Sequence, residues 1–383
     1  MPDRSRARLA LLRVAAGLAS PGRATRTGEL RLLVVRPDHL GDLVFLSPAL
    51  TELRASLPEA HITLAVGPWG AGTAQLLPQV DRVETHPFPG FQRGPKPSAV
   101  APYAQAARLA AHWTGRYDAC LISRPDHWWG AMAASFAGIR SIVGWSTPET
   151  WPFLTEALPI VTGRHEVATN LALIRHFVAE RGRAASSAPP TPGSPPLALQ
   201  VPRADAEAAE TWLNRVLGEG AGYVCVHPGA GAPTKLWPEG QFRGLIRELH
   251  DRTGLPILVT GSLEEADLVE STASASLGAI PTPGEFTVPQ LAWVLSRARV
   301  CVGSDSGPLH LASALDGRTV HIYGPADEAK FGPWSPPERH QVLRADVSCR
   351  PCGDLQECHV DPPLACMTEV PVADVLEAAL SLL

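Results

Sequence analysis

Three short segments of the sequence carry residue types that could bind an anion or move a proton, and each follows a run of apolar residues. They are 36–42, 227–235 and 303–310. In α/β proteins, turns of this kind lie at the carboxyl ends of parallel strands, which is where ligands bind. We therefore take these segments as the candidate site and ask what chemistry each one supports.

The first segment ends in Gly41-Asp42, at the predicted start of a helix. Glycine permits a tight turn. The Asp42 carboxylate would then project from the rim of the sheet, where it could accept a proton. An aspartate at this place could equally serve only as a helix cap, so the residue types alone leave both roles open.

The other two segments suit a phosphate group. Gly229 and Ala230 let backbone N–H groups approach an anion, and Lys235 can neutralise it. In the third segment a strand leads through a tight turn into a helix whose N-terminus favours negative charge. The alternatives are a glycine-rich turn with a solvated lysine, a helix cap at Asp305 or Ser306, and a core histidine at His310.

Several classes of protein are disfavoured by motif or composition. The first predicted strand is not followed by GxGxxG, Lys235 lacks the flanking residues of a P-loop, and neither GxSxG nor HExxH occurs. No apolar run in the 383 residues approaches the roughly 18–20 needed to span a bilayer. The net charge of −5 argues against a nucleic-acid partner.

Apolar runs alternate with segments of helical periodicity, which predicts parallel sheets covered by helices on both faces. The strands of the first half are predicted over 31–36, 61–66, 81–86, 117–123 and 141–145, with helices over 42–57 and 99–113. Those of the second half are predicted over 223–229, 256–261, 298–304 and 319–324, between helices over 203–217 and 370–383.

The proline-rich segment 184–199 cannot form regular structure and predicts a stiff linker. We therefore expect two doubly wound, Rossmann-like α/β domains that face each other across a ligand cleft. The predicted parts are a basic N-terminal extension (1–28), a first domain (29–183), the linker (184–200) and a second domain (201–383).

The N-terminal extension holds six arginines and the apolar stretch LALLRVAAGLA. This pattern predicts a basic amphipathic helix that is either disordered or lies on a membrane surface. A signal peptide is disfavoured because Arg13 interrupts the apolar stretch.

The seven cysteines fall into two groups. Three lie in predicted strands and are expected to be buried: Cys120, Cys225 and Cys301. The other four crowd together near His359: Cys349, Cys352, Cys358 and Cys366. Their spacing leaves a structural metal site, redox or disulfide use, and plain reduced thiols as alternatives.

The motifs taken together resemble glycosyltransferase family 9, which contains the ADP-heptose:lipopolysaccharide heptosyltransferases. The matching motifs, in chain order, are RPDHLGDL, HPGAG, KLWPEGQF and SDSGPLHLA. The resemblance implies a GT-B fold, with the acceptor on the first domain and the nucleotide sugar on the second. It also implies inversion at the anomeric carbon without a catalytic metal.

The resemblance also implies roles for individual residues. Asp42 matches the general base, and Lys235 matches the lysine that contacts the diphosphate. Glu265, or in a competing alignment Glu264, matches the acid that holds the ribose hydroxyls. The nucleotide-binding turn matches Asp305, Ser306, Gly307 and His310, with Gly229 and Ala230 beside it. On the acceptor side stand Arg36, His39 and Gly41, where His39 replaces the small residue usual in the family.

The predicted function is therefore transfer of a sugar, a heptose by family precedent, from a nucleotide diphosphate donor to a cell-envelope glycan or glycolipid. No DxD-like pair is present, no cofactor is required for this reaction, and a cytoplasmic place with peripheral contact to the inner face of the membrane is expected. The alternatives are a nucleotide-sugar 2-epimerase of the same fold and a non-catalytic glycan- or nucleotide-binding protein.

Overall fold

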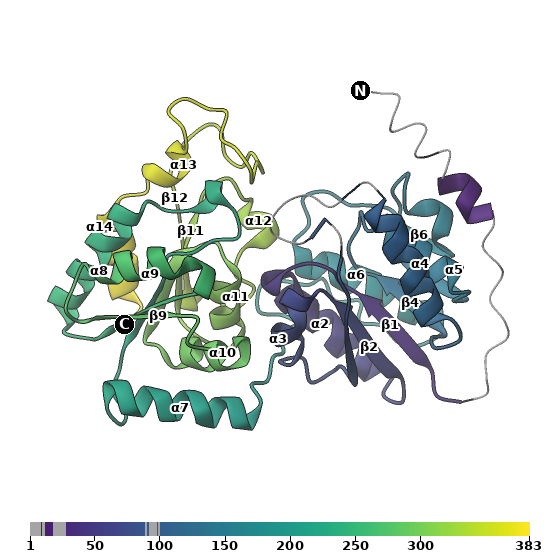
Figure 1. The fold of residues 1–383 in the computed structure, drawn as a ribbon, viewed down its shortest axis with the longest axis horizontal. Helices are drawn as coiled ribbons and strands as arrows, with labels where there is room; N and C mark the ends of the chain where they lie inside the picture. Colours follow the sequence, from purple (N-terminus) through teal and green to yellow (C-terminus); the bar gives the residue numbers. More distant parts are fainter. Residues whose placement is uncertain (1–8, 10–11, 18–27, 89, 92–97, 99) are drawn as a thin grey trace. The chain divides into compact units, whose positions relative to one another are not determined.

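The chain folds into two compact α/β units (Figure 1). The computed structural model describes residues 9, 12–17, 28–88, 90–91, 98 and 100–383. The first unit consists of Met1–His39 with Leu46–Ala188, and the second of Leu40–Phe45 with Pro189–Leu383. Each unit is described below by itself.

The first unit contains a parallel six-stranded sheet with the strand order β3-β2-β1-β4-β5-β6. Its strands are β1 (Arg31–Val35), β2 (His61–Val66), β3 (Arg82–Thr85), β4 (Ala119–Ile122), β5 (Ser141–Trp145) and β6 (Glu156–Leu158). Its helices include α3 (Ala71–Ala74), α4 (Ala101–Trp113), α5 (Trp128–Phe136) and α6 (Glu166–Ala179). Helix α2 (Leu40–Ser56) is divided, with Leu40–Phe45 in the second unit and the rest in the first.

The second unit repeats this topology with the order β12-β11-β10-β7-β8-β9, again all parallel. Its strands are β7 (Val224–His227), β8 (Ile257–Gly261), β9 (Ala279–Pro283), β10 (Val300–Ser304), β11 (Thr319–Tyr323) and β12 (His340–Arg344). Its helices include α7 (Arg203–Leu217), α8 (Glu239–Thr253), α9 (Ala266–Ala273), α10 (Val288–Arg297), α11 (Gly307–Ala314), α12 (Glu328–Phe331), α13 (Ala365–Thr368) and α14 (Val372–Ser381).

Both sheets are doubly wound, as the sequence predicted. In such a sheet the chain leaves the first strand for one side and later returns to build the other side, so a switch point lies between two central strands. Here the switch points lie between β1 and β4 and between β7 and β10. The loops that follow these four strands are therefore the expected places for ligands.

Burial of alternate apolar residues holds the helices on the sheets. One face of the second sheet packs against α8 and α14 through Val224, Val226, Ile257, Val259, Val300, Val302, Val320 and Ile322. In the first unit, β1 and β4 pack against α4 and α5, whose Trp113 and Trp129 are almost fully buried. Removing this apolar area from water is the main favourable term in folding.

The structure confirms the strands that were predicted in both sheets, but the sequence patterns did not reveal three edge strands. Neither β6 nor β12 has a continuous apolar run, because each borders only one neighbouring strand. β9 contains Pro281 and Pro283. Proline cannot donate to a ladder and is tolerated at a sheet edge, so its presence hid a real strand.

Part of the N-terminal extension is attached to the first unit. Residues 12–17 are helical, and Leu12, only 1% exposed, belongs to the core that α4 and α5 form. These residues therefore pack on the protein, whereas we had expected a disordered or membrane-bound helix. The other five arginines of the extension lie outside the described residues.

The segment predicted as a linker contains no helix or named strand. The chain passes from the first to the second unit at Ala188 and Pro189. Beyond that point the backbone carbonyl of Pro195 accepts a hydrogen bond from the indole N–H of Trp334 at 2.9 Å, which attaches this end of the segment to the second unit.

Candidate functional site

The switch point of the second sheet brings two of the predicted segments together. The loop of residues 228–235 follows β7, and Asp305-Ser306 follows β10, the strand next to β7. A Cβ atom on Gly303 would lie 2.5 Å from the backbone oxygen of His227. Only glycine therefore lets the two strands approach this closely before the loops diverge.

A buried ion pair joins the two loops. The Lys235 Nζ atom lies 2.6 Å from Asp305 Oδ2, and His310 Nε2 lies 3.1 Å from Asp305 Oδ1. The side chain of Asp305 is 5% exposed and that of Lys235 is 15% exposed. Both oxygens of the carboxylate are thus engaged by residues that the sequence had singled out.

The electrostatics of Asp305 follow from this geometry. Burial by itself would raise the pKa of Asp305, but the Lys235 charge and the hydrogen bond with His310 outweigh it and hold that pKa well below its ordinary value. Asp305 is therefore an anion at neutral pH, and Lys235 is its principal counter-charge.

Ser306 occupies the N-cap position of α11 but does not cap it. Its side chain makes no capping hydrogen bond, and its hydroxyl is buried without a hydrogen-bond partner among the described residues. An unpaired buried hydroxyl costs free energy. Since it lies beside the N-terminus of a helix, which favours anions, this hydroxyl is placed to donate to a ligand.

The loop after β7 lies under an acidic side chain. A Cβ atom on Gly229 would lie 2.2 Å from Glu265 Oε1, so any larger residue here would displace the Glu265 carboxylate. Glu265 also accepts a hydrogen bond from the backbone N–H of Ser262 at 2.8 Å, which fixes its carboxylate over the loop. Glu264 is exposed. The geometry therefore favours Glu265 over Glu264 as the acid beside the loop.

Two further histidines lie in this sheet: His227, which opens the predicted segment 227–235, and His321, which the sequence did not single out. His227 and His321 are buried, and burial lowers the pKa of each below its ordinary value. His321 stands on β11 and its ring lies 5.6 Å from that of His310. His227 is the last residue of β7, whereas His321 lies in the middle of β11, where no motif marks it.

The residues predicted for the acceptor side lie at the start of α2. His39 takes the N-cap position without a capping hydrogen bond, and Gly41 and Asp42 lie in the first turn. A carboxylate in the first turn is stabilised by the helix dipole. Asp42 is therefore not the N-cap that the simpler interpretation expected.

Arg36 is buried in a polar network at the switch point of the first sheet. Its guanidinium group lies 2.7 Å from Asp38 and 2.8 Å from Glu166, and it donates to Asn170 at 3.0 Å. With 2% exposure its charge is satisfied by the protein itself. Asp38 also pairs with Arg124, which the sequence analysis did not single out.

The four clustered cysteines are close in space but are not drawn together as a compact ligand set. They are free thiols, and burial together with the neighbouring Cys349, Cys352 and Cys358 raises the pKa of Cys366. Cys358 Sγ accepts a hydrogen bond from the backbone N–H of Leu364 at 3.2 Å.

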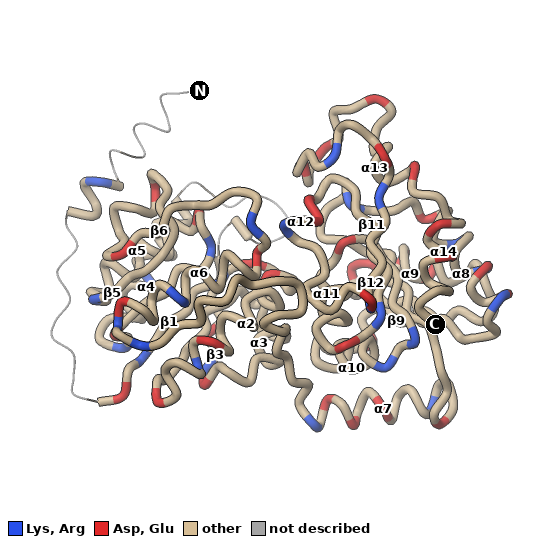
Figure 2. Tube along the Cα trace, turned by 180° about the vertical axis from the view of Figure 1, so that it is seen from behind, with Lys and Arg blue, Asp and Glu red and all other residues tan. Residues whose placement is uncertain are grey.

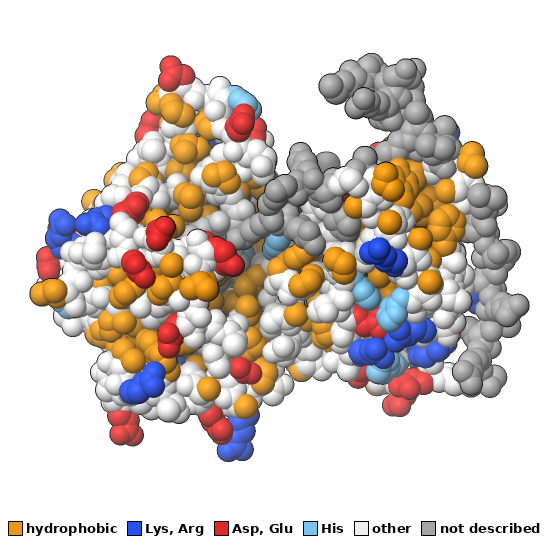
Figure 3. Space-filling view, viewed as in Figure 1, with side chains coloured by type: hydrophobic (Ala, Val, Ile, Leu, Met, Phe, Trp, Pro, Cys, Tyr) orange, Lys and Arg blue, Asp and Glu red, His pale blue; other side chains and the backbone are white. Residues whose placement is uncertain are grey.

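Within the described part of the chain, the metal-like group that does converge is Glu84, His86 and His112, whose ligand atoms lie within 4.8 Å of one another. Two arginines already provide the counter-charge of Glu84: Arg116 at 3.0 Å and Arg82 at 3.4 Å. Burial by itself would raise the pKa of Glu84, but the hydrogen bonds with His86 and Tyr117 and the charges of His112 and Arg116 outweigh it and lower that pKa to about 2. Figure 3 shows histidine and basic side chains gathered on one face of this unit.

We expect Asp305→Asn to lower the free energy of unfolding by about 3–5 kcal/mol at pH 7, because it removes one partner of a buried ion pair. The pKa of Asp305 is lowered by folding, so the stabilisation is present above its ordinary value of 3.8 and is lost as the pH falls further. Urea unfolding at pH 7 and pH 3 should show the gap between variant and wild type narrowing at the lower pH. The exposed Asp251→Asn serves as the control, and a pH-independent gap would contradict the assignment.

Known proteins resemble this chain in sequence. The model of "Glycosyltransferase family 9 (heptosyltransferase)" matches residues 108–360. Lipopolysaccharide heptosyltransferase 3 of Escherichia coli is 28% identical over 43% of this chain, which spans about half (48%) of that relative. Lipopolysaccharide heptosyltransferase 2 of E. coli K12 is 24% identical over 82% of this chain and 87% of the relative.

Solved structures share the fold. ADP-heptose lipopolysaccharide heptosyltransferase II of E. coli has a TM-score of 0.69 at 20% identity, covering 92% of this chain and 98% of that one. An E. coli heptosyltransferase solved with ADP has a TM-score of 0.65 at 19% identity, covering 92% and 100%. The iron-containing dodecameric glycosyltransferase TibC of enterotoxigenic E. coli has a TM-score of 0.53 at 15% identity, covering 94% and 80%.

These likenesses establish a GT-B type fold, and no described helix has the length and hydropathy to cross a membrane. The family match covers more than half of the chain and includes the loops after β7 and β10, in which Lys235 and Asp305 lie. The chain therefore belongs to glycosyltransferase family 9, the heptosyltransferase family.

Proposed function

We propose that this chain transfers a sugar from a nucleoside diphosphate donor to a hydroxyl group of a cell-envelope glycan or glycolipid, with inversion and without a catalytic metal. The observation that carries the proposal is the Lys235–Asp305 pair at the switch point of the second sheet, next to the unpaired Ser306 hydroxyl. The second predicted domain (201–383) would bind the donor, and the first predicted domain (29–183) would bind the acceptor.

Donor binding uses the charges already in place. A lysine ammonium has three N–H donors, and Asp305 engages one of them, so Lys235 can also donate to a phosphate oxygen. The Ser306 hydroxyl and the backbone N–H of Gly307 add further donors, and His310 keeps Asp305 in position. Gly229 and Ala230 leave room for the donor, and Glu265 would accept hydrogen bonds from ribose hydroxyls.

An adenosine diphosphate donor is favoured by the relatives, since one similar structure is named for ADP-heptose and another was solved with ADP. The leaving diphosphate gains negative charge as the bond to the sugar breaks. Fixed donors and one ammonium group stabilise that charge without reorganisation. This arrangement provides what a metal ion supplies in other transferases.

Inversion requires a single displacement. The acceptor hydroxyl oxygen forms a bond to the anomeric carbon while the bond from that carbon to the diphosphate oxygen breaks, and the hydroxyl proton passes to a base. We assign this base to Asp42, whose carboxylate form is stabilised by its place in the first turn of α2. Gly41 and His39 would shape the acceptor side, whereas the buried Arg36 positions Asp38 and Glu166.

We expect Asp42→Asn to reduce sugar transfer by about 10²–10⁴-fold, because the amide cannot accept the proton. Donor affinity should match that of the wild type, and the free energy of unfolding should fall by less than about 1 kcal/mol, the worth of a first-turn charge at the helix dipole. The assay measures ADP release from ADP-heptose with a lipopolysaccharide-core acceptor, with Asp251→Asn as the matched control. A folded variant that transfers at the wild-type rate would falsify the role of Asp42. An altered sugar without transfer in the wild type would indicate epimerisation.

We also propose a structural metal held by Cys349, Cys352, Cys358 and Cys366. Thiols are the donors that such a metal requires: three of them lie in the segment before α13, Cys366 lies in α13, and the Cys358 sulfur already accepts a backbone N–H bond that would stabilise a thiolate. Such a metal would cross-link the loop ahead of α13. The similar iron-containing structure favours iron over zinc as the first candidate.

Elemental analysis of anaerobically purified protein should find about one metal ion per chain. Cys358→Ser should release it and lower the unfolding temperature, whereas Cys225→Ala, in a buried strand, should retain the metal. A metal-free wild type of undiminished stability would leave only the redox and reduced-thiol alternatives.

The place of the protein at the cytoplasmic face of the membrane stays a prediction. Its support is the exposure of Arg13 and Val14 on the short N-terminal helix, whose opposite side packs on the first unit. A basic and an apolar side chain side by side suit an anionic lipid surface.

A further inference from the structure

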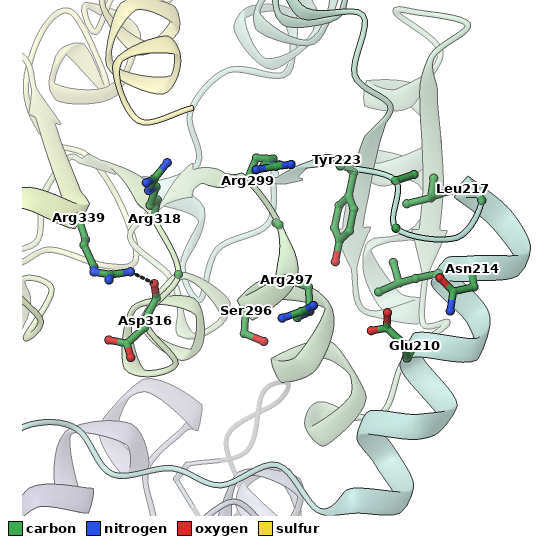
Figure 4. A pocket seen from close by; sticks show the side chains of 17 residues that line it. Glu210, Asn214, Leu217, Tyr223, Ser296, Arg297, Arg299, Asp316, Arg318 and Arg339 are labelled. Carbon is green, nitrogen blue, oxygen red and sulfur yellow. Dashed lines mark hydrogen bonds between the residues drawn. The ribbon is translucent and has the colours of Figure 1, made fainter.

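A polar pocket lies at the amino ends of the strands of the second sheet. It has a volume of about 420 Å³ and is lined by the ends of α7 and α10 and by the residues that lead into β7, β10 and β11 (Figure 4). Lys235 and Asp305 come after β7 and β10 and therefore lie at the opposite, carboxyl ends of these strands. The two sites do not share a lining residue.

The strand register places a row of arginines along this pocket. Arg299, Arg318 and Arg339 each immediately precede a strand, namely β10, β11 and β12, which are neighbours in the parallel sheet. Adjacent strands lie about 4.8 Å apart, so three guanidinium groups start from neighbouring positions. Arg297, at the end of α10, is the fourth arginine in the lining of the pocket.

The contacts of these arginines are with main-chain oxygens and an aromatic ring, not with acidic side chains. Arg318 donates to the carbonyl oxygen of Leu382 at 2.7 Å and to an oxygen of Leu383 at 3.3 Å. Arg339 donates to the carbonyl oxygen of Asp316 at 2.7 Å. Arg297 lies over the ring of Trp293. Among the described residues, no Asp or Glu side chain lies within ion-pair distance of any of the four.

Two carboxylates also line the pocket, but they leave an excess of positive charge. Glu210 accepts a hydrogen bond from the Trp293 indole N–H at 2.8 Å, and the Asp316 side chain is exposed. Four guanidinium groups therefore face two carboxylates in a chain whose net charge is −5. Like charges held side by side repel one another, so an anion bound between them would relieve a local cost.

We propose that this pocket binds a small soluble polyanion with two or more adjacent phosphate groups. The planar guanidinium group binds phosphate oxygens in pairs, and the volume lies in the range of small-ligand sites. The one aromatic side chain in the lining, Tyr223, is buried and its hydroxyl donates to the Val294 carbonyl at 2.6 Å. The pocket thus recognises the phosphates of the ligand and offers no ring to stack on a base.

The test is calorimetric titration with inorganic pyrophosphate. The double variant Arg297→Gln/Arg299→Gln removes two exposed charges for which the structure shows no hydrogen bond, so it should fold as wild type does. We expect its affinity for pyrophosphate at this site to fall by about tenfold or more, the loss typical of one charge-assisted hydrogen bond. The exposed pair Arg247→Gln/Arg252→Gln on α8 makes the same change in net charge and should leave the affinity unchanged.

The design separates this site from the proposed donor site. The affinity of pyrophosphate for a site beside Lys235 would not change in Arg297→Gln/Arg299→Gln. A loss of affinity in this variant therefore reports on the arginines of the pocket. No pyrophosphate binding by the wild type, or equal affinity in the pocket variant, would overturn the proposal. Binding only to vesicles of phosphatidic acid, lost in the pocket variant, would also overturn it in favour of a lipid surface.

Discussion

The buried carboxylate of Asp305 is the charge on which the arrangement of the second unit's site depends. Removing an ion from water costs several kcal/mol in a protein, and only a close counter-charge with good hydrogen bonds offsets that cost. Lys235 and His310 supply this compensation from two different segments. The loop after β7 and the start of α11 are thereby held at a fixed separation, which is the requirement for a site that must meet a diphosphate.

The same constraint acts in the first unit. Arg36 follows β1, and its charge is met by Asp38 and Glu166, while Asp38 is shared with Arg124 beyond β4. Both networks stand at the switch point of a doubly wound sheet, where two neighbouring strands send their loops in opposite directions. The repeated topology therefore creates two places at which polar residues converge. The charged residues of α7, coloured in Figure 2, belong to neither network. This helix precedes β7 and leads into the second sheet.

The central strands and the residues that follow them could be predicted from the sequence because both obey local rules. A strand buried on both faces is a continuous apolar run, and glycine with small residues marks the turn after it. The edge strand β9 could not be predicted, since its prolines are allowed only by its position at the edge. The choice of Glu265 over Glu264 depended on which carboxylate lies over Gly229, a tertiary contact. The arginines of the pocket at the amino ends of the strands could not be predicted as a group either. Arg299, Arg318 and Arg339 are far apart in sequence and become neighbours only through the strand order of the sheet.

The most direct test of the account is the affinity of ADP for the wild type and for Lys235→Ala, measured by calorimetry on folded protein. The account predicts a loss of about 1.5–3 kcal/mol in binding free energy, the worth of one charge-assisted contact to a partly buried phosphate. Lys330→Ala, which removes an exposed lysine from the same unit, should bind ADP as the wild type does. Equal affinity in a folded Lys235→Ala protein would contradict the account, because Lys235 would then serve only to neutralise Asp305.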